Sequence, residues 1–397
     1  MKMGTETLVV WVSGRRTGLL GREDGPRHVF SYDPLTQDSD QVSLTMPVRL
    51  ESWVSRELHP VFQMNLPEGT LLEAIRRAVA KLAGEDDLTI LRVTGGNQIG
   101  RNRFSLVGDE APGLPESPES LEELLTYPNT SELFHELMDR YSLRSGISGV
   151  QPKVLLDATD RASLTTAGYI IKSWGEEYPQ LAANEFFCMS AAKQAGLPVP
   201  EFHLANNGGL FVMKRFDLGS AGLSLGFEDM CSLQGVGTSR KYAGSYERVA
   251  RSIRDFVSAE YQAPAREQYF QMMVLSLMVR NGDAHLKNFG VLYESARGPV
   301  RLAPVYDVVT TTAYIRKDVP ALTLAGAKKW WSRKAMAQFA VTHLSLSSSS
   351  IRQAFERVAD AVTENRGRVL AYIRDHPEFR ETGQTMLAEW KSGVTDS

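Results

Sequence analysis

Two residues with the types and spacing needed for phosphoryl transfer, Asp283 and Asn288, lie in the segment Asn281–Asn288, which reads NGDAHLKN. The catalytic loop of protein kinases places an Asp and an Asn with four residues between them, because the Asp reaches the acceptor hydroxyl while the Asn binds a metal ion on the phosphates. A second carboxylate holds Mg²⁺ across the phosphates, and Asp307 is the candidate. These residues predict a phosphotransfer site. A turn-capping Asp beside a loop histidine, His285, is the alternative interpretation, since Asp and Asn are common in turns.

The elements around this loop must present the two carboxylates. Residues 267–280 (EQYFQMMVLSLMVR) are apolar on nearly every face, which predicts a helix buried in a domain core, and Gly282 would end it. The next segments, FGVLYE, SARG and PVRLAPVYD, predict a strand, a turn at Gly298 and a second strand. We therefore expect the helix end to present Asp283 and the hairpin to end at Asp307, which would bring Asp307 beside the loop.

A candidate phosphate loop lies earlier in the chain. Residues 146–153 (GISGVQPK) lead into a short predicted strand, so that the backbone N–H groups around Ser148, Gly149 and Val150 could approach phosphates and Lys153 would follow them. The segment matches neither the GxGxxG pattern nor a Walker loop, and a simple Gly-Ser turn is the alternative.

Two further segments predict contacts with a nucleotide. Residues 167–172 form an apolar strand that ends in Lys172, the arrangement in which a kinase lysine neutralises the α- and β-phosphates; an exposed, solubilising lysine is the alternative. The strand 210–213 runs into the position expected of a hinge, where Phe216 would contribute to the adenine site and Asp217 would bind the ribose.

Length and composition indicate an ordinary globular protein. The chain has 397 residues, enough for two or three domains, with 43% hydrophobic and 23% charged residues. A net charge of −3 creates no global field that would attract nucleic acid. Cys188 and Cys231 fall in predicted buried segments, which argues against a disulfide scaffold or a zinc cluster. We find no leader and no apolar run near membrane length, so we expect a cytoplasmic protein.

The order of the predicted elements favours an α+β, two-lobed, protein-kinase-like fold with an extra β-rich N-terminal subdomain and an α-helical C-terminal lobe. The N-terminal subdomain is predicted at residues 1–107, followed by a linker rich in Pro, Gly, Glu and Ser at residues 108–120. A small lobe that carries the phosphate loop is predicted at residues 121–217, and a helical large lobe at residues 218–397.

Several motifs together carry a family resemblance. In chain order they are ISGVQPK, YIIK, NEFFC, AGLPVP, MKRFD, EDMC, NGDAHLKN and VYD. This series resembles the HipA family of bacterial serine/threonine kinase toxins across residues 140 to 330. LPEG at residues 66–69 and GRNRF at residues 100–104 are similar to the family's N-terminal subdomain, so that the resemblance extends over almost the whole chain.

The resemblance implies a role for each matching residue. It implies a catalytic Asp283, with His285 at the family's loop histidine, and Mg²⁺ ligands at Asn288 and Asp307. It also implies ATP contacts from Lys153 and Lys172, from the phosphate-loop residues Ser148, Gly149 and Val150, and from the hinge residues Phe216 and Asp217. Family members autophosphorylate a serine in this loop. Ser148 is the candidate here, with Ser145 just before the motif, while Gly146 occupies a position where members can carry that serine.

The implied function is that of a toxin-type serine/threonine protein kinase that uses ATP and Mg²⁺. Its substrate would be a translation component such as an aminoacyl-tRNA synthetase, and its partner a DNA-binding, HipB-like antitoxin through which it would contact DNA indirectly. A kinase of a small molecule or lipid is one alternative, because related folds use a similar loop. A pseudokinase that only binds an antitoxin or a nucleotide is another, against which intact Lys172, Asp283, Asn288 and Asp307 argue.

Overall fold

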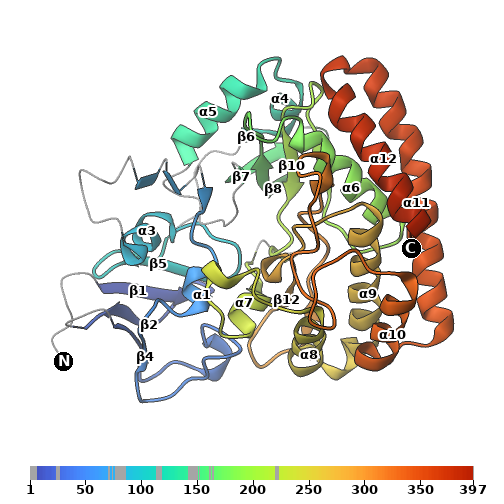
Figure 1. Ribbon diagram of the computed structural model, residues 1–397. Coiled ribbons are helices and arrows are strands. Elements are labelled where there is room, and N and C mark those ends of the chain that lie inside the picture. The colour runs from blue at the N-terminus through green and yellow to red at the C-terminus, as the bar shows by residue number, and fades with distance from the viewer. Residues whose placement is uncertain are drawn as a thin grey trace. The chain divides into compact units, whose positions relative to one another are not determined.

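The computed structural model describes residues 7–23, 27–69, 72–73, 75–76, 86–112, 119–141, 151, 153–160, 162, 165–219 and 223–396. By its internal contacts the chain divides into two compact units. The first unit comprises Met1–Ser173, Val212–Ser239 and Val291–Val300, and the second comprises Trp174–Phe211, Arg240–Gly290 and Arg301–Ser397. Figure 1 labels most of the helices and strands of both units.

The first unit begins with a five-stranded antiparallel sheet in the order β4-β3-β2-β1-β5. Its strands are β1 (Thr7–Val12), β2 (Arg15–Arg22), β3 (His28–Tyr32), β4 (Trp53–Ser55) and β5 (Asn102–Leu106), and its helices are α1 (Pro60–Gln63) and α3 (Asp87–Thr94). The rings of Phe30, Phe62 and Phe104 pack edge to face in the core, which joins α1 to the sheet. This sheet agrees with the β-rich N-terminal subdomain that the sequence predicts.

A second sheet of this unit carries the predicted lysines. Its order includes β6-β7-β8-β10, formed by β6 (Glu119–Ser120), β7 (Lys153–Asp160), β8 (Thr165–Lys172) and β10 (Phe211–Lys214), and α4 (Leu121–Thr126) and α5 (Thr130–Tyr141) lie between β6 and β7 in the chain. The predicted linker is wrong at its C-terminal end, because Glu119 and Ser120 pair in parallel with β7. Ser120 also caps α4 by accepting a hydrogen bond from the Glu123 backbone N–H at 3.3 Å.

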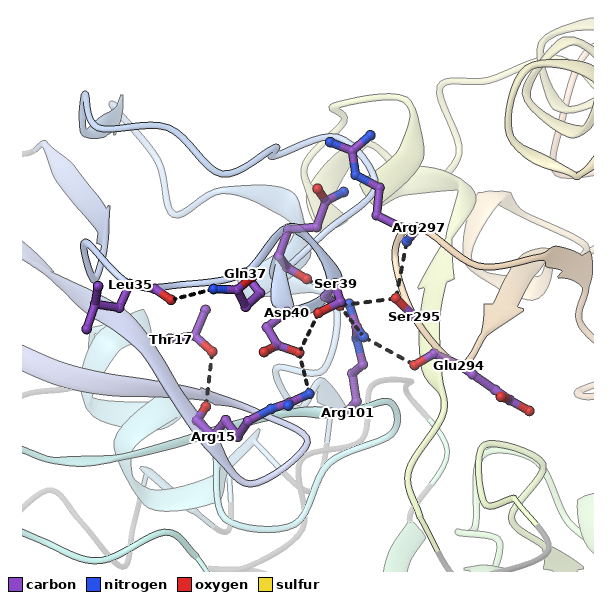
Figure 2. Close-up of polar contacts among 11 residues, drawn as sticks. Arg15, Thr17, Leu35, Gln37, Ser39, Asp40, Arg101, Glu294, Ser295 and Arg297 are labelled. Atoms are coloured by element: carbon purple, nitrogen blue, oxygen red, sulfur yellow. Dashed lines mark hydrogen bonds and ion pairs between the residues drawn. The ribbon is translucent and has the colours of Figure 1, made fainter.

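A buried arginine connects the N-terminal sheet to a third sheet, β11-β12-β13. This sheet comprises β11 (Gly226–Asp229), which α7 (Met230–Leu233) follows, β12 (Gly290–Tyr293) and β13 (Val300–Leu302). Arg101 donates hydrogen bonds to the carbonyl oxygens of Ser39, Gln41 and Glu294 at 3.0, 2.8 and 3.3 Å (Figure 2). Because Glu294 directly follows β12, one guanidinium group ties the β12–β13 turn to the N-terminal segment.

A buried carboxylate, that of Glu228 in β11, strengthens the same connection. It accepts hydrogen bonds from the Ser43 hydroxyl, the Leu44 backbone N–H, the Tyr293 hydroxyl and the Ser232 hydroxyl at 2.6 to 2.9 Å. Burial raises the pKa of Glu228, while these hydrogen bonds act in the opposite direction. Four donors on one buried carboxylate hold segments of the first unit that are distant in sequence.

The second unit is largely helical. It contains β9 (Phe202–Leu204) and the helices α6 (Leu181–Gln194), α8 (Tyr246–Phe256), α9 (Gln262–Met278), α10 (Arg333–Leu344), α11 (Ser348–Asp375) and α12 (Arg380–Asp396). Helix α9 packs against α8, α10, α11 and α12, and Figure 1 shows α9, α11 and α12 side by side. These neighbours bury several faces of α9, as its apolar sequence predicts.

The helix predicted at residues 267–280 is confirmed in type, although α9 begins earlier, at Gln262, and ends earlier, at Met278. Cys188 and Cys231 are free and buried, as predicted. Of the helices that the structure describes, none combines the length and the apolar character needed to cross a membrane.

Candidate active site

The loop after α9 starts from a tightly fixed position. The Asn281 backbone N–H donates to the Ser276 carbonyl at 2.8 Å, and the Gly282 N–H donates to Thr311 Oγ1 at 2.7 Å. A Cβ atom at Gly282 would lie only 2.0 Å from Asp318 Oδ2 and 2.9 Å from Thr311 Oγ1, so a larger residue would displace these side chains. Contrary to the prediction, Gly282 does not end the helix, because α9 ends at Met278; it instead joins the loop to the segment that follows Asp307.

Hydrogen bonds inside the loop fold Asp283 and Asn288 toward each other. Asn281 Oδ1 accepts from the Asp283 N–H at 3.1 Å, and the His285 N–H donates to the Asp283 carbonyl at 2.8 Å and to Asn288 Oδ1 at 2.9 Å. Residues Leu286–Asn288 form a 3-10 turn. His285 is buried, and its main-chain N–H contributes to the shape of the loop.

Asn288 and Asp307 lie together, as the sequence predicts. Asn288 Nδ2 donates to Asp307 Oδ2 at 3.1 Å. The hairpin expected to end at Asp307 is shorter than predicted, since its second strand, β13, ends at Leu302. Pro304 accounts for this, because proline has no N–H to donate to a strand ladder. Asp307 instead lies in a loop with a φ of 61°, a left-handed conformation that is unusual for an aspartate and typical of functional sites.

Thr310 fixes the loop that contains Asp307. Its backbone N–H donates to Asn184 Oδ1 at 2.8 Å, and its carbonyl accepts from Asn184 Nδ2 at 3.1 Å. Its hydroxyl accepts from Trp390 Nε1 at 2.7 Å and lies 3.4 Å from the Cys188 sulfur. All four residues are fully buried or nearly so. Helices α6 and α12 thus hold the backbone three residues after Asp307.

The Asp283 carboxyl has a strongly perturbed acidity. Its pKa is raised from 3.8 to about 6, mainly by burial. The Tyr242 hydroxyl lowers the pKa, because it donates a hydrogen bond to Oδ1 at 2.8 Å. The charge of Asp307 raises the pKa, and the charge of Lys241 lowers it. Asp318 also raises it. A carboxylate with a pKa near the working pH is well suited to accept a proton in a reaction at neutral pH.

Tyr242 and Lys241 are site residues that the sequence did not reveal. They precede the loop by about forty residues and belong to no motif with a periodic or spacing signal. Their tertiary position alone identifies them.

Asn288 and Asp307 have the chemistry of Mg²⁺ ligands. Magnesium prefers oxygen atoms and is usually bound by one or two protein groups together with phosphates. The Asp307 carboxylate and the Asn288 amide oxygen supply such atoms, and the hydrogen bond from His285 N–H fixes which way the amide of Asn288 points. Within the described ranges no three His, Cys, Asp or Glu side chains gather into a metal cluster.

In the first unit, Lys153 and Lys172 are direct cross-strand neighbours on β7 and β8. They are 4% and 3% exposed. Residues directly opposite each other on antiparallel strands share a face of the sheet, so the two lysines lie on the same face. The predicted phosphate-loop residues Ser148, Gly149 and Val150, together with Ser145 and Gly146, lie outside the described residues.

The contacts of Asp217 favour a structural role. Its side chain is 0% exposed, and it accepts hydrogen bonds from Arg215 Nη2 and Nε at 2.6 and 3.0 Å and from the Gly100 N–H at 2.7 Å. Phe216 is half-buried, and its ring packs edge to face on Phe227. Contact of these two hinge residues with ribose and adenine stays a prediction.

Comparisons with known proteins agree with the motifs. A model of the HipA-like C-terminal domain matches residues 145–366, and a model of the HipA N-terminal domain matches residues 8–105. Two putative kinases of Sinorhizobium fredii are 28% and 29% identical over 298 and 341 residues, which cover 68% and 79% of this chain and 66% and 79% of theirs. The first of these matches therefore spans just under two thirds of the relative.

HipA from Shewanella oneidensis provides a structural match as well. The serine/threonine-protein kinase toxin HipA of this organism is 25% identical over 280 residues, covering 64% of this chain and 63% of its own. A solved complex of HipA, HipB and operator DNA from Shewanella oneidensis contains a chain that matches with a TM-score of 0.67 and 18% identity, over 98% of this chain and 99% of that one. This match shows the predicted α+β fold, with its β-rich N-terminal subdomain and helical C-terminal region. Since the C-terminal model alone covers more than half of the residues, the chain belongs to the HipA family.

Proposed function

We propose that this chain is a toxin-type serine/threonine protein kinase that uses ATP and Mg²⁺. The observation that carries the proposal is the hydrogen bond between Asn288 and Asp307, next to an Asp283 whose pKa is raised to about 6. The relatives named as kinases support phosphoryl transfer in general.

Each residue has a separate task in the proposed reaction. Asp283 orients the acceptor hydroxyl and accepts its proton as the oxygen attacks the γ-phosphorus and ADP leaves. Asn288 and Asp307 would hold Mg²⁺, which when bound neutralises charge on the β- and γ-phosphates. Lys153 and Lys172 contribute positive charge toward the nucleotide phosphates.

The substrate and partner follow from the family. We propose a translation component, such as an aminoacyl-tRNA synthetase, as the substrate, and the cytoplasm as the location. The solved HipA of Shewanella oneidensis is in complex with HipB and operator DNA, which supports a HipB-like antitoxin as the partner of this chain. Autophosphorylation at Ser148 is part of the same proposal.

Two isosteric substitutions test the chemistry. Asp283→Asn removes the base, so we expect ADP release from Mg-ATP to be lost while nucleotide binding is retained. Asp307→Asn weakens a metal ligand, so we expect weaker Mg-dependent ATP binding in addition to lost turnover. Asp360→Asn, an exposed aspartate of α11, is the matched control and should behave as wild type. Wild-type turnover in either site variant would contradict that assignment.

The substrate class needs a cellular experiment. Phosphopeptides from cells that express the wild-type protein or Asp283→Asn should differ at serines or threonines of the substrate protein. If phosphorylated metabolites differ and phosphopeptides do not, the chain is a small-molecule kinase. If neither differs and purified protein releases no ADP, the chain is a pseudokinase.

A further inference from the structure

The Asp283 carboxylate has a neighbour outside the predicted motifs. Tyr242 donates a hydrogen bond from its hydroxyl to Asp283 Oδ1 at 2.8 Å. It lies in the turn between a 3-10 helix, Thr238–Arg240, and α8. A role for this contact in the reaction rests on the proposed function, because it presupposes that Asp283 accepts a proton.

The backbone around Tyr242 is attached to the loop that carries Asp283. The Leu286 N–H donates to the Lys241 carbonyl at 3.2 Å, and Lys328 Nζ donates to the Tyr242 carbonyl at 3.2 Å. A Cβ atom at Gly244 would lie 2.7 Å from the Leu286 side chain, so the turn is pressed against the loop. These contacts hold the turn against the loop, so Tyr242 keeps its position relative to Asp283.

The ring of Tyr242 is held as well. It packs edge to face against the His285 ring, with centroids 5.1 Å apart, and the Lys241 ammonium group lies 5.4 Å from its centroid. This explains why a buried histidine belongs in the loop, since it supports the ring whose hydroxyl contacts Asp283. Tyr242 remains 43% exposed, so part of the residue is open to solvent.

A single hydrogen bond at one carboxylate oxygen has a clear mechanical effect. The terminal torsion of an aspartate side chain has a broad energy profile, so the plane of the carboxylate is poorly defined without a partner. A donor on Oδ1 defines that plane. The other oxygen, Oδ2, is then directed in a fixed orientation and is available for the acceptor hydroxyl.

We propose that Tyr242 is a positioning residue that orients the Asp283 carboxylate through Oδ1, so that Oδ2 accepts the proton of the acceptor hydroxyl. In the reaction the acceptor O–H bond breaks, its oxygen bonds to the γ-phosphorus, its proton moves to Oδ2 and ADP leaves. The Tyr242 hydroxyl keeps its own proton throughout. The role concerns the chemical step and not the binding of ATP.

The test is Tyr242→Phe in the full chain, with ADP release from Mg-ATP followed at steady state in the presence of a serine-containing peptide that supplies the acceptor hydroxyl. This substitution removes only the hydroxyl and keeps the packed ring. We expect kcat to fall about tenfold, the change that corresponds to one lost orienting hydrogen bond, while KM and Kd for ATP stay at wild-type values. Tyr261→Phe is the matched control, because Tyr261 is similarly exposed, at 38%, and precedes α9 away from the loop. It should leave all three constants unchanged.

The outcomes separate this inference from the proposed function. An unchanged kcat in Tyr242→Phe would overturn the inference, and so would a raised kcat, which would show that the tyrosine obstructs the acceptor. A higher KM for ATP at unchanged kcat would also overturn it, because it would assign Tyr242 to nucleotide binding. By contrast, a wild-type protein without ADP release, or an Asp283→Asn variant as active as wild type, would refute the proposed kinase reaction, and the inference with it.

Discussion

A glycine in the last helix should control both stability and the placement of the catalytic loop. Gly393 of α12 packs on Met278, the last residue of α9 and thus the support of the loop after it. A Cβ atom at this position would lie 2.1 Å from the Met278 carbonyl oxygen, and 2.7 and 2.9 Å from its carbonyl carbon and Cα. All three atoms are backbone, so no side-chain rotation can relieve the contact. Gly393→Ala must therefore move α12 away from α9.

The size of the effect follows from two opposing contributions. Overpacking of a core contact costs about 1–3 kcal/mol. Alanine offsets part of this, because it favours a helix over glycine by about 1 kcal/mol. Because the added methyl group meets only backbone atoms, the upper part of the overpacking range applies, and we expect a net loss of about 1–2 kcal/mol, which lowers Tm by roughly 2–8 °C for a cooperative unit of this size. Turnover should also fall, because α9 presents Asp283.

Gly367→Ala is the matched control. Gly367 lies in α11, is exposed, and would have no atom within 4 Å of an added Cβ. Without a clash only the helix preference remains, so this variant should gain about 0.5–1 kcal/mol. Thermal and urea unfolding followed by circular dichroism measures both. A Gly393→Ala protein as stable as wild type would refute the close packing of the two helices, and a destabilised Gly367→Ala would refute the helix-preference reasoning.

Three further predictions concern single groups. Asp283 must be ionised to accept a proton, and with a pKa of about 6 it is half protonated at pH 6. We therefore expect kcat/KM for ATP to fall about tenfold between pH 7 and pH 5, measured in a buffer series. An aspartate with a pKa of 3.8 would instead keep nearly full activity over that range. Asp217→Asn leaves the buried Arg215 charge without its ion-pair partner and should destabilise the first unit by about 3–5 kcal/mol in urea; a loss below about 1 kcal/mol would contradict this. Trp390→Phe removes a buried hydrogen bond to Thr310 and leaves space in the core where the fully buried indole packed, so it should cost at least about 1 kcal/mol in the same assay, and no loss of stability would contradict this.

The elements that the sequence predicts well are those with continuous patterns. The apolar run at residues 267–280 indicates a buried helix because several neighbours bury several of its faces. The C-terminal end of β13 was predicted less well. The apolar residues around Pro304 favour a longer strand, although proline has no N–H to donate to a strand ladder. The strand at Glu119–Ser120 has no local signal, since it is two residues long and pairs with a strand more than thirty residues later.

The site was predictable where its residues share one loop, and less so elsewhere. The spacing of Asp283 and Asn288 is local, and the loop that follows the hairpin brings Asp307 to Asn288. Tyr242 reaches Asp283 from another part of the chain, so no spacing rule could find it. The pairing of Asp217 with Arg215 was accessible in principle, because residues two apart in an extended segment lie on the same side and carry opposite charges here.

The contacts that α12 makes with Thr310 and Met278 also determine when the site can form during synthesis. Translation proceeds from the N-terminus, so Asp283, Asn288 and Asp307 are made before Trp390 and Gly393. At about 5–20 residues per second, the stretch from Asp307 to α12 takes on the order of ten seconds. Throughout that interval the nascent chain lacks both the indole donor to Thr310 and the helix face that covers the end of α9. The ribosome-bound chain thus carries the residues of the proposed site before it can hold them in place, and the proposed kinase activity should follow the emergence of α12.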